Sequence, residues 1–252
     1  MNIHQEALRR EASEYVLTGD FHTHTTFSHG TGSIEDNVKT AVSKGLETIA
    51  ISDHGPGHLT YGIKRRDIPV MRSRIDGLKG KYPQIKILLS VEANIISAFP
   101  YTDIKPEEAA QLDFLIAGYH YGIPRGHCIP NWLNAHGFPI NHRRLLVKNT
   151  DMVLRCIYQN DIKILTHPGD KGPFDIAEIA KACEETDTLM EINMKHPHLT
   201  TEEIRVAAKR DVKFIISSDA HRPENVGLYE GGLQRALAAG LDPGRIVNIR
   251  RR

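Results

Sequence analysis

The sequence is poor in cysteine and aromatic residues and contains no long apolar run. Its three cysteines (Cys128, Cys156 and Cys183) form no C-x-x-C pair, so we expect neither a disulfide framework nor a zinc–thiolate site. No apolar run approaches the roughly 18 residues of a membrane span, and the first residues lack the apolar core of a signal peptide. We therefore expect a cytoplasmic protein with no membrane partner.

A large excess of charge of either sign is also absent. Lys and Arg number 32 and Asp and Glu number 31, which gives a formal net charge of +1. This balance does not favour a nucleic-acid partner or a membrane surface. The 40% of hydrophobic and 25% of charged residues are typical of a folded globular protein, and 252 residues fit one α/β barrel.

Short, nearly continuous apolar segments alternate with helical patterns, which is typical of parallel β/α units. The predicted strands are residues 16–21, 47–52, 86–92, 113–119, 162–166, 188–193 and 212–218. Capping-box pairs such as Ser33 with Asp36 and Thr200 with Glu203 mark helix starts, and a further helix is predicted over 68–81. The pattern predicts a single α/β domain built as a closed or nearly closed barrel. An open doubly wound sheet is the alternative, although no G-x-G-x-x-G or Walker sequence supports its nucleotide-binding forms.

Two segments lie outside this alternation. Residues 1–15 are a polar prefix with a helical pattern, which leaves residues 16–252 as the main domain. Residues 121–150 form a long insertion after the fourth strand, and such insertions are often functional. We interpret the insertion either as a lid over a substrate site or as a solvated excursion packed on its own aromatic rings. Its cationic and aromatic residues include Arg125, His127, Trp132, His136, Phe138, His142, Arg143, Arg144 and Lys148.

Histidine is abundant, with 14 residues, and it is the commonest metal ligand in proteins. Six of the seven predicted strands end in residues of ligand type, and the carboxyl ends of barrel strands meet at one mouth. One such residue is more often an ordinary core residue, but burying the whole set without a cation would cost several kcal/mol. The set is His22, His24, His29, His54, Glu92, His120, His167, Asp219 and His221. It predicts a metal site, and its nitrogen and oxygen donors suit Zn, Mn or Fe.

Seven segments of the sequence resemble the PHP (polymerase and histidinol phosphatase) family. In chain order they are DFHTHTTFSHG, ISDHGP, SVEANI, LIAGYH, ILTHPG, LMEIN and ISSDAHRP, spanning about residues 17–225. Within that family the sequence is most similar to the stand-alone phosphatases with three metal ions. The resemblance implies a distorted (β/α)7 TIM-like barrel.

The resemblance also implies how the ligands are shared among three divalent ions, zinc in the first place and manganese or iron as alternatives. His22, His24 and Asp219 would hold the first ion, and Glu92 would bridge it to the second. His120 and His167 would complete the second site. His29, His54 and His221 would hold the third.

The predicted chemistry is phosphoester hydrolysis by a metal-bridging hydroxide, with a small phosphomonoester as substrate, as in a histidinol phosphatase or a related enzyme. Arg222 and Lys195 are candidates for binding the phosphate. Asp53 adjoins His54 and is expected to orient an imidazole, with a general-acid role as the alternative. A metal-bound water or Asp219 would protonate the leaving group. The candidate catalytic residues are thus Glu92, Asp219, Arg222 and Asp53.

Three other functions fit parts of the pattern. A nuclease or a DNA-polymerase-associated editing module is the main alternative, because PHP domains also occur attached to polymerases. A metal-dependent amidohydrolase likewise opens with H-x-H after a barrel strand, but the chain is short for that class. A non-catalytic structural module is disfavoured because the ligand set is complete.

Overall fold

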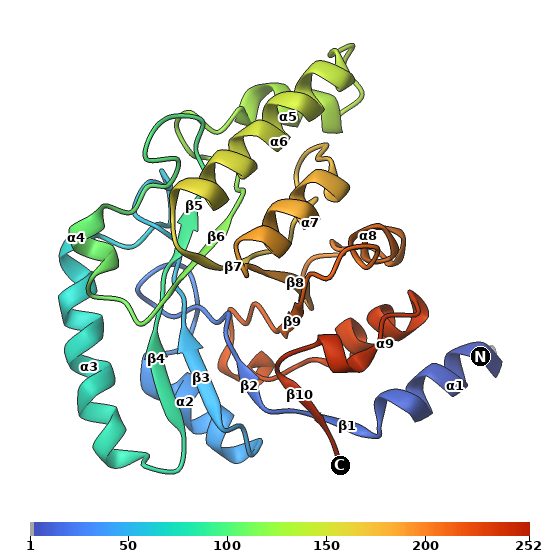
Figure 1. The fold of residues 1–252 in the computed structure, drawn as a ribbon. Coiled ribbons are helices and arrows are strands. Elements are labelled where there is room, and N and C mark those ends of the chain that lie inside the picture. Colours follow the sequence, from blue (N-terminus) through green and yellow to red (C-terminus); the bar gives the residue numbers. More distant parts are fainter. Residues whose placement is uncertain (1–2) are drawn as a thin grey trace.

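The barrel strands form because their apolar segments are buried on both faces, as in parallel sheets covered by helices. The computed structural model describes residues 3–252 (Figure 1). The strands run in two parallel sheets, β2-β3-β4 and β5-β6-β7-β8-β9. Their bounds are β2 (Gly19–Asp20), β3 (Thr48–Ile51), β4 (Lys86–Leu89), β5 (Glu92–Asn94), β6 (Leu115–Gly118), β7 (Ile162–Leu165), β8 (Leu189–Asn193) and β9 (Phe214–Ser217).

Two isolated bridges connect the sheets into a distorted ring. Strands β4 and β5 are two parts of one extended segment, separated only by Ser90 and Val91. A parallel bridge joins His54 to Glu92, and another joins Thr23 to Ala220 beyond the ends of β2 and β9. Counting β4 and β5 as one, the ring has the seven strand positions that the sequence predicts, so the predicted distorted (β/α)7 TIM-like barrel is confirmed.

Helices connect the strands and cover the outside of the barrel (Figure 1). Both predicted capping boxes are present, at Ser33 and Thr200. The helix predicted over 68–81 has those bounds. The helices are α1 (Ile3–Ala12), α2 (Ile34–Ser43), α3 (Ile68–Lys81), α4 (Pro106–Ala109), α5 (Cys128–Ala135), α6 (His142–Gln159), α7 (Ile176–Glu185), α8 (Thr201–Ala207) and α9 (Glu230–Ala238), with 3₁₀ turns at Arg65–Asp67, Pro223–Asn225 and Pro243–Arg245. None of the described helices is long and apolar enough to cross a membrane.

The structure divides two of the predicted segments. The segment expected as one strand over 16–21 contributes to both β1 (Tyr15–Leu17) and β2, and β1 pairs antiparallel with the C-terminal β10 (Ile249–Arg251). Residues 121–150 contain α5 and the first turns of α6, the helix that leads into β7. Their role as a lid remains a prediction.

The inside of the barrel is filled below the strand ends by a small apolar cluster. Ile116, Ile164, Leu189 and Ile215 come one from each of β6 to β9, and Phe21 and Phe114 pack against them. A larger core lies between the sheets and the helices. Polar side chains at the carboxyl ends of the strands therefore stand on an apolar floor.

Asn248 closes the seam between β2 and β9. Its Nδ2 donates to the carbonyl oxygens of Gly19 at 2.8 Å and Ile216 at 2.7 Å, and its Oδ1 accepts from the Ile216 N–H at 3.0 Å. The side chain is buried. It therefore satisfies backbone groups of two strands that are not otherwise paired at this point.

Replacing Asn248 with alanine would leave those backbone groups without partners. We expect the free energy of unfolding to fall by about 3 kcal/mol, because each buried unpaired polar group costs roughly 1–3 kcal/mol. Urea denaturation followed by circular dichroism measures the change. The control is Asn134→Ala, at a half-buried position of α5, with an expected change within about 0.5 kcal/mol. Equal losses in the two variants would contradict the seam role.

Candidate metal centre

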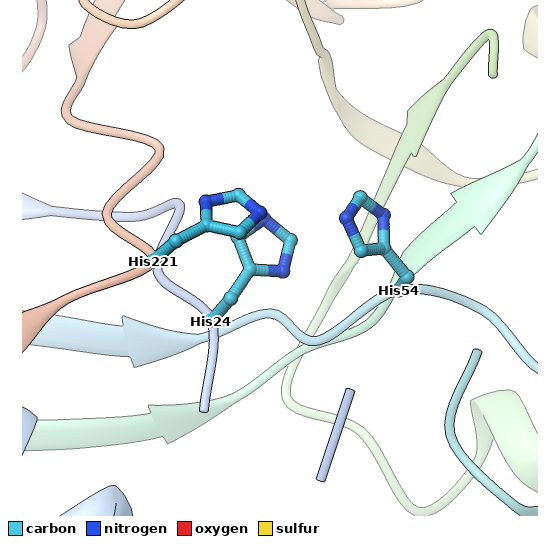
Figure 2. A group of neighbouring side chains, drawn as sticks. All are labelled: His24, His54 and His221. Atoms are coloured by element: carbon cyan, nitrogen blue, oxygen red, sulfur yellow. The ribbon is translucent and has the colours of Figure 1, made fainter. Parts of the chain in front are cut away.

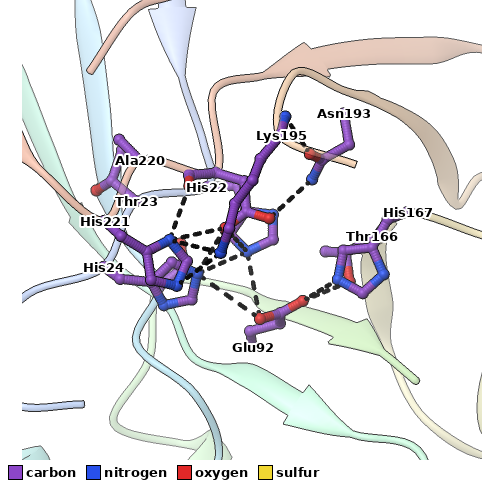
Figure 3. Close-up of polar contacts among 12 residues, drawn as sticks. His22, Thr23, His24, Glu92, Thr166, His167, Asn193, Lys195, Ala220 and His221 are labelled. Carbon is purple, nitrogen blue, oxygen red and sulfur yellow. Dashed lines mark hydrogen bonds and ion pairs between the residues drawn. The ribbon is translucent and has the colours of Figure 1, made fainter. Parts of the chain in front are cut away.

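The carboxylate of Glu92, at the start of β5, lies at the centre of a cluster of imidazoles (Figure 3). Its Oε1 is 2.9 Å from His167 Nε2 and 3.2 Å from His120 Nε2. Its Oε2 is 2.9 Å from His54 Nδ1 and 3.3 Å from His22 Nε2. One carboxylate thus has a pair of imidazoles on each oxygen, and the four histidines follow four different strands.

Close packing of β6 against Glu92 leaves room for this arrangement only if residue 118 is glycine. A Cβ atom at Gly118 would lie 2.7 Å from Glu92 Oε1 and 2.2 Å from Thr166 Oγ1. The same Thr166 hydroxyl donates to Glu92 Oε1 at 2.7 Å. The glycine therefore permits the approach that the carboxylate requires.

A second group is formed by His22, His24 and Asp219. His24 Nε2 is 3.0 Å from His22 Nε2 and 3.1 Å from Asp219 Oδ1, and His22 Nε2 is 3.8 Å from that same oxygen. Both histidines are buried, as the H-x-H spacing predicts for side chains on the same face of an extended segment. These three donors are close enough to share one ion.

A third group lies at the mouth, where His24, His54 and His221 face one another (Figure 2). The exposed ring of His29 has its centroid 4.8 Å from that of His54 and 4.1 Å from that of His221. The structure thus brings together all nine expected ligand residues. The donor atoms nearest one another differ in part from the implied sharing, because His24 lies with His54 and His221, and His54 lies with Glu92 and His120.

The nitrogen and oxygen atoms of this cluster are better suited to binding divalent ions than to hydrogen-bonding one another. Several buried nitrogen and oxygen atoms of this cluster have no hydrogen-bond partner, and they belong to His24, His54, Glu92, His120, His167 and Asp219. An unpaired buried polar atom costs about 1–3 kcal/mol, so we expect a bound ion to stabilise this cluster. Imidazole nitrogens and carboxylate oxygens are the donors that zinc, manganese and iron accept.

Several members of the cluster favour the protonation states that bind metal. Burial lowers the pKa of His24 to about 3 and that of His167 to about 4, which keeps both rings neutral. Burial alone would raise the pKa of Glu92, but the surrounding histidines, His120 first, hold it well below its ordinary value. Neutral imidazoles and ionised carboxylates are the forms that bind metal ions.

His22 is the exception in this cluster. Burial would lower its pKa, but the carboxylates of Glu92, Glu191 and Asp219 raise it well above the ordinary value. Metal binding there therefore displaces a proton.

Two residues of the cluster have strained backbones. Asp219 has φ = 50° and His167 has φ = 30°, in the left-handed region that non-glycine residues rarely adopt. Such conformations cost roughly 1–3 kcal/mol and gather at functional sites. Here they turn the two side chains inward at the ends of β9 and β7.

Glu191, in the middle of β8, is a neighbour of the cluster that the sequence pattern did not single out. Its Oε1 is 2.8 Å from His22 Nδ1, and its Oε2 accepts from the N–H of His167 and from Asn193 Nδ2, both at 2.8 Å. It thereby fixes the His22 ring so that Nε2 faces the cluster. A charged residue inside the apolar strand LMEIN was the signal that could have identified it.

Other neighbours of the cluster orient its rings. Asn94 Oδ1 is 2.9 Å from His120 Nδ1, which leaves His120 Nε2 facing Glu92. His196, beyond β8, lies 3.0 Å from Asp170 Oδ2 and 3.4 Å from Asp219 Oδ2. From the sequence, His196 beside Pro197 could either line the mouth or lie in a solvent-facing loop, and the structure places it next to Asp219.

The structure gives Asp53 partners other than the expected imidazole. Its buried carboxylate accepts from the Thr25 N–H and hydroxyl, both at 2.7 Å, and from the Ser28 hydroxyl. Asp53 therefore holds the turn that runs from His24 to His29. The expected orientation of an imidazole is corrected to the positioning of this turn.

The two candidate phosphate-binding cations differ in position. Lys195 Nζ lies 3.1 Å from both ring nitrogens of His221 and 3.9 Å from Asp219 Oδ1, so it overhangs the cluster (Figure 3). Arg222 points away: its side chain is 67% exposed, and among the described residues it forms an ion pair with Glu224, at 3.8 Å. The structure thus brings Lys195, but not Arg222, to the candidate centre.

The fold and site together define a barrel protein with a buried cluster of histidines and carboxylates fitted to divalent metal ions. The sequence profile of the family described as PHP domain matches residues 20–196, and the chain belongs to this family.

Relatives and solved structures are consistent with this assignment. A protein of Shewanella sp. (strain MR-4) named as a probable phosphatase is 29% identical over 234 residues, covering 87% of this chain and 81% of the relative. One of Acetivibrio thermocellus with the same name is 29% identical over 227 residues, covering 84% and 82%. The histidinol phosphate phosphatase of Lactococcus lactis, solved with zinc, L-histidinol and phosphate, superposes with a TM-score of 0.60 at 15% identity, covering 90% of this chain and 95% of that one. At this identity the superposition shows a shared fold.

Glu191→Gln should weaken metal binding while leaving the fold intact. The amide keeps the size of the side chain but removes the charge that orients His22. It also points an amide N–H at one of the three groups that now bond the carboxylate: the His22 ring, the His167 N–H or the Asn193 side chain. We expect metal affinity to fall by about 10–100-fold, as for other residues that orient ligands. Competition with a chromophoric chelator measures the affinity. Glu178→Gln, on the exposed side of α7, is the matched control, and unchanged affinity in Glu191→Gln would remove this role.

Proposed function

We propose that this chain is a metal-dependent phosphoesterase, and specifically a phosphatase that hydrolyses small phosphomonoesters in the cytoplasm. The observation that supports this most is the Glu92 carboxylate, placed between two pairs of imidazoles with several unpaired donor atoms around it. The names of the relatives, and the phosphate bound by the Lactococcus lactis enzyme, support phosphorus over carbon as the centre attacked. The catalytic domain would be residues 16–252, with 1–15 as a prefix.

The proposed ligands are the nine residues identified from the sequence, shared among three divalent ions with zinc as the first choice. His22, His24 and Asp219 form one group, and Glu92 links it to His120 and His167. His29, His54 and His221 form the group at the mouth, where His24 also lies within reach. Ions bound there would lower the pKa of a water molecule and neutralise charge on the phosphoryl oxygens.

The remaining residues would orient the substrate and the ligands. Lys195 has its ammonium group over His221 and 44% of its side chain exposed, so it can bind a phosphate from the solvent side. Asn193 accepts from the N–H groups of Lys195 and His196, both at 2.8 Å, which fixes the turn that bears the lysine. Asp53 would hold the His24–His29 turn in the same way.

Glu92→Ala should abolish phosphate release from a panel of phosphomonoesters and reduce the bound metal. The reason is that Glu92 lies close to four imidazoles that follow four different strands. Phosphate assays and elemental analysis of the same protein samples measure both quantities, with Glu178→Gln as the control. Full turnover with full metal content in Glu92→Ala would refute the proposal. Wild-type protein that binds metal but releases no phosphate from any monoester would refute the monoesterase assignment.

Lys195→Ala should raise KM for a phosphomonoester by about tenfold or more, since a hydrogen bond to a charged group contributes roughly 1.5–3 kcal/mol. Metal content should stay at the wild-type level, and Lys195→Arg should restore part of the affinity. Arg222→Ala should change KM by less than about twofold, because an exposed side chain paired with Glu224 contributes little. The opposite order of the two variants would assign the phosphate to Arg222 instead.

A further inference from the structure

The segment that connects β6 to the middle of α6 contains no acidic residue. Over residues 121–150 there are four Lys or Arg and three His and no Asp or Glu, although the whole chain has a net charge of only +1. The four cations are Arg125, Arg143, Arg144 and Lys148, and all are exposed. None of the four forms an ion pair with a carboxylate among the described residues 3–252. A locally cationic surface, formed by the exposed side chains of residues 121–150, is therefore present although the charges of the whole chain nearly cancel.

This surface is held rigidly beside the mouth of the barrel. Helix α5 and the start of α6 project from the rest of the molecule (Figure 1). Asn131 Nδ2 donates to Tyr119 Oη at 2.8 Å and to Asn149 Oδ1 at 3.1 Å, which ties α5 to β6 and α6. The Cys128 thiol, at the start of α5, lies 3.6 Å from the His120 carbonyl oxygen. The projecting helices are thus fixed to the strand end that bears a candidate ligand.

Aromatic rings stand exposed at the tip of the projection. Trp132 is 46% exposed and Phe138 is 52% exposed. The ring of His136 stacks on Trp132 with centroids 4.1 Å apart and an interplanar angle of 28°, and Phe138 lies at 6.3 Å and 29°. The rings of His136 and Phe138 each lie within about 30° of the plane of Trp132, and the exposed parts of Trp132 and Phe138 offer flat apolar surfaces for stacking.

Two of the four cations, Arg144 and Lys148, line a recess between α5 and the start of α6. A groove of about 310 Å³ is lined by His127, Pro130, Ile140, Asn141, Arg144, Leu145 and Lys148. Burial first, and then the nearby Lys148, lower the pKa of His127, which leaves Arg144 and Lys148 as the cations of the recess. Nothing anionic among the described residues neutralises Arg144 or Lys148, so an external anion is the natural partner.

We propose that the α5–α6 projection binds single-stranded nucleic acid, with backbone phosphates in the groove on Arg144 and Lys148 and bases stacked on Trp132 and Phe138. Cations that follow a phosphate backbone beside exposed aromatic rings are the combination that single strands require. An anionic bilayer fits less well, because two of the cations line a recess rather than lying level with the exposed apolar side chains. An acidic polypeptide would use the charges but not the exposed rings. The proposal does not depend on the phosphatase activity.

The test is fluorescence anisotropy of a labelled single-stranded RNA or DNA of about 12 nucleotides, titrated with the full-length metal-loaded protein between about 50 and 200 mM salt. We expect Trp132→Ala to weaken binding by about tenfold, because stacking contributes strongly for each base. Arg144→Ala/Lys148→Ala should reduce the slope of log affinity against log salt by about 1.4, at roughly 0.7 for each phosphate that the protein no longer neutralises.

The matched control is Lys86→Ala/Lys209→Ala, which removes the same charge from two exposed positions outside the α5–α6 projection. It should leave both affinity and salt slope close to wild type. Circular dichroism and thermal unfolding check that each variant remains folded. No binding by wild-type protein, or equal losses in the control and groove variants, would overturn the proposal. Tighter binding to anionic vesicles or to poly-glutamate than to the oligonucleotide would also overturn it and would identify the actual class of partner.

Discussion

The structure depends on burying one carboxylate where the strands of the barrel end. An isolated ionised Glu92 in this position would cost several kcal/mol, so it has to be surrounded by groups that compensate for its charge. Four imidazoles and the Thr166 hydroxyl supply that environment. Their positions in turn fix where the segments after β2, β3, β6 and β7 must end, so the barrel mouth is organised around this group.

Around that centre, the chain keeps its ligands in place by hydrogen bonds at their far sides. Glu191 orients His22, Asn94 orients His120, and Asp53 holds the turn between His24 and His29. These residues prevent the rings from turning to satisfy one another, which leaves several donor atoms unpaired and free to bind an ion. Part of the folding stability is therefore given up in the protein without metal, as expected where binding and folding are coupled.

Charge is distributed locally in this protein, and its global balance is a poor guide to its surface. The cations at 121–150 form no ion pair among the described residues, whereas two of the three C-terminal arginines are compensated: Arg250 pairs with Glu47 and Arg251 with Glu14. Two basic segments of similar size in the sequence thus differ in how much of their charge is neutralised by nearby carboxylates. Which of them is free to meet a partner depends on what the fold places beside it.

The sequence by itself determined the barrel and the types of donor at its mouth. Apolar strands alternating with capped helices have few other ways to pack, and the carboxyl ends of parallel strands must meet at one edge. Only the tertiary structure decided which imidazole faces which oxygen of Glu92, that Glu191 lies behind His22, that Asp53 holds a turn, and that Arg222 points outward. These outcomes depend on backbone direction after each strand, such as the left-handed Asp219 and His167, and on neighbours distant in sequence. The local sequence pattern specifies neither the backbone direction after a strand nor the neighbours that come from distant parts of the chain.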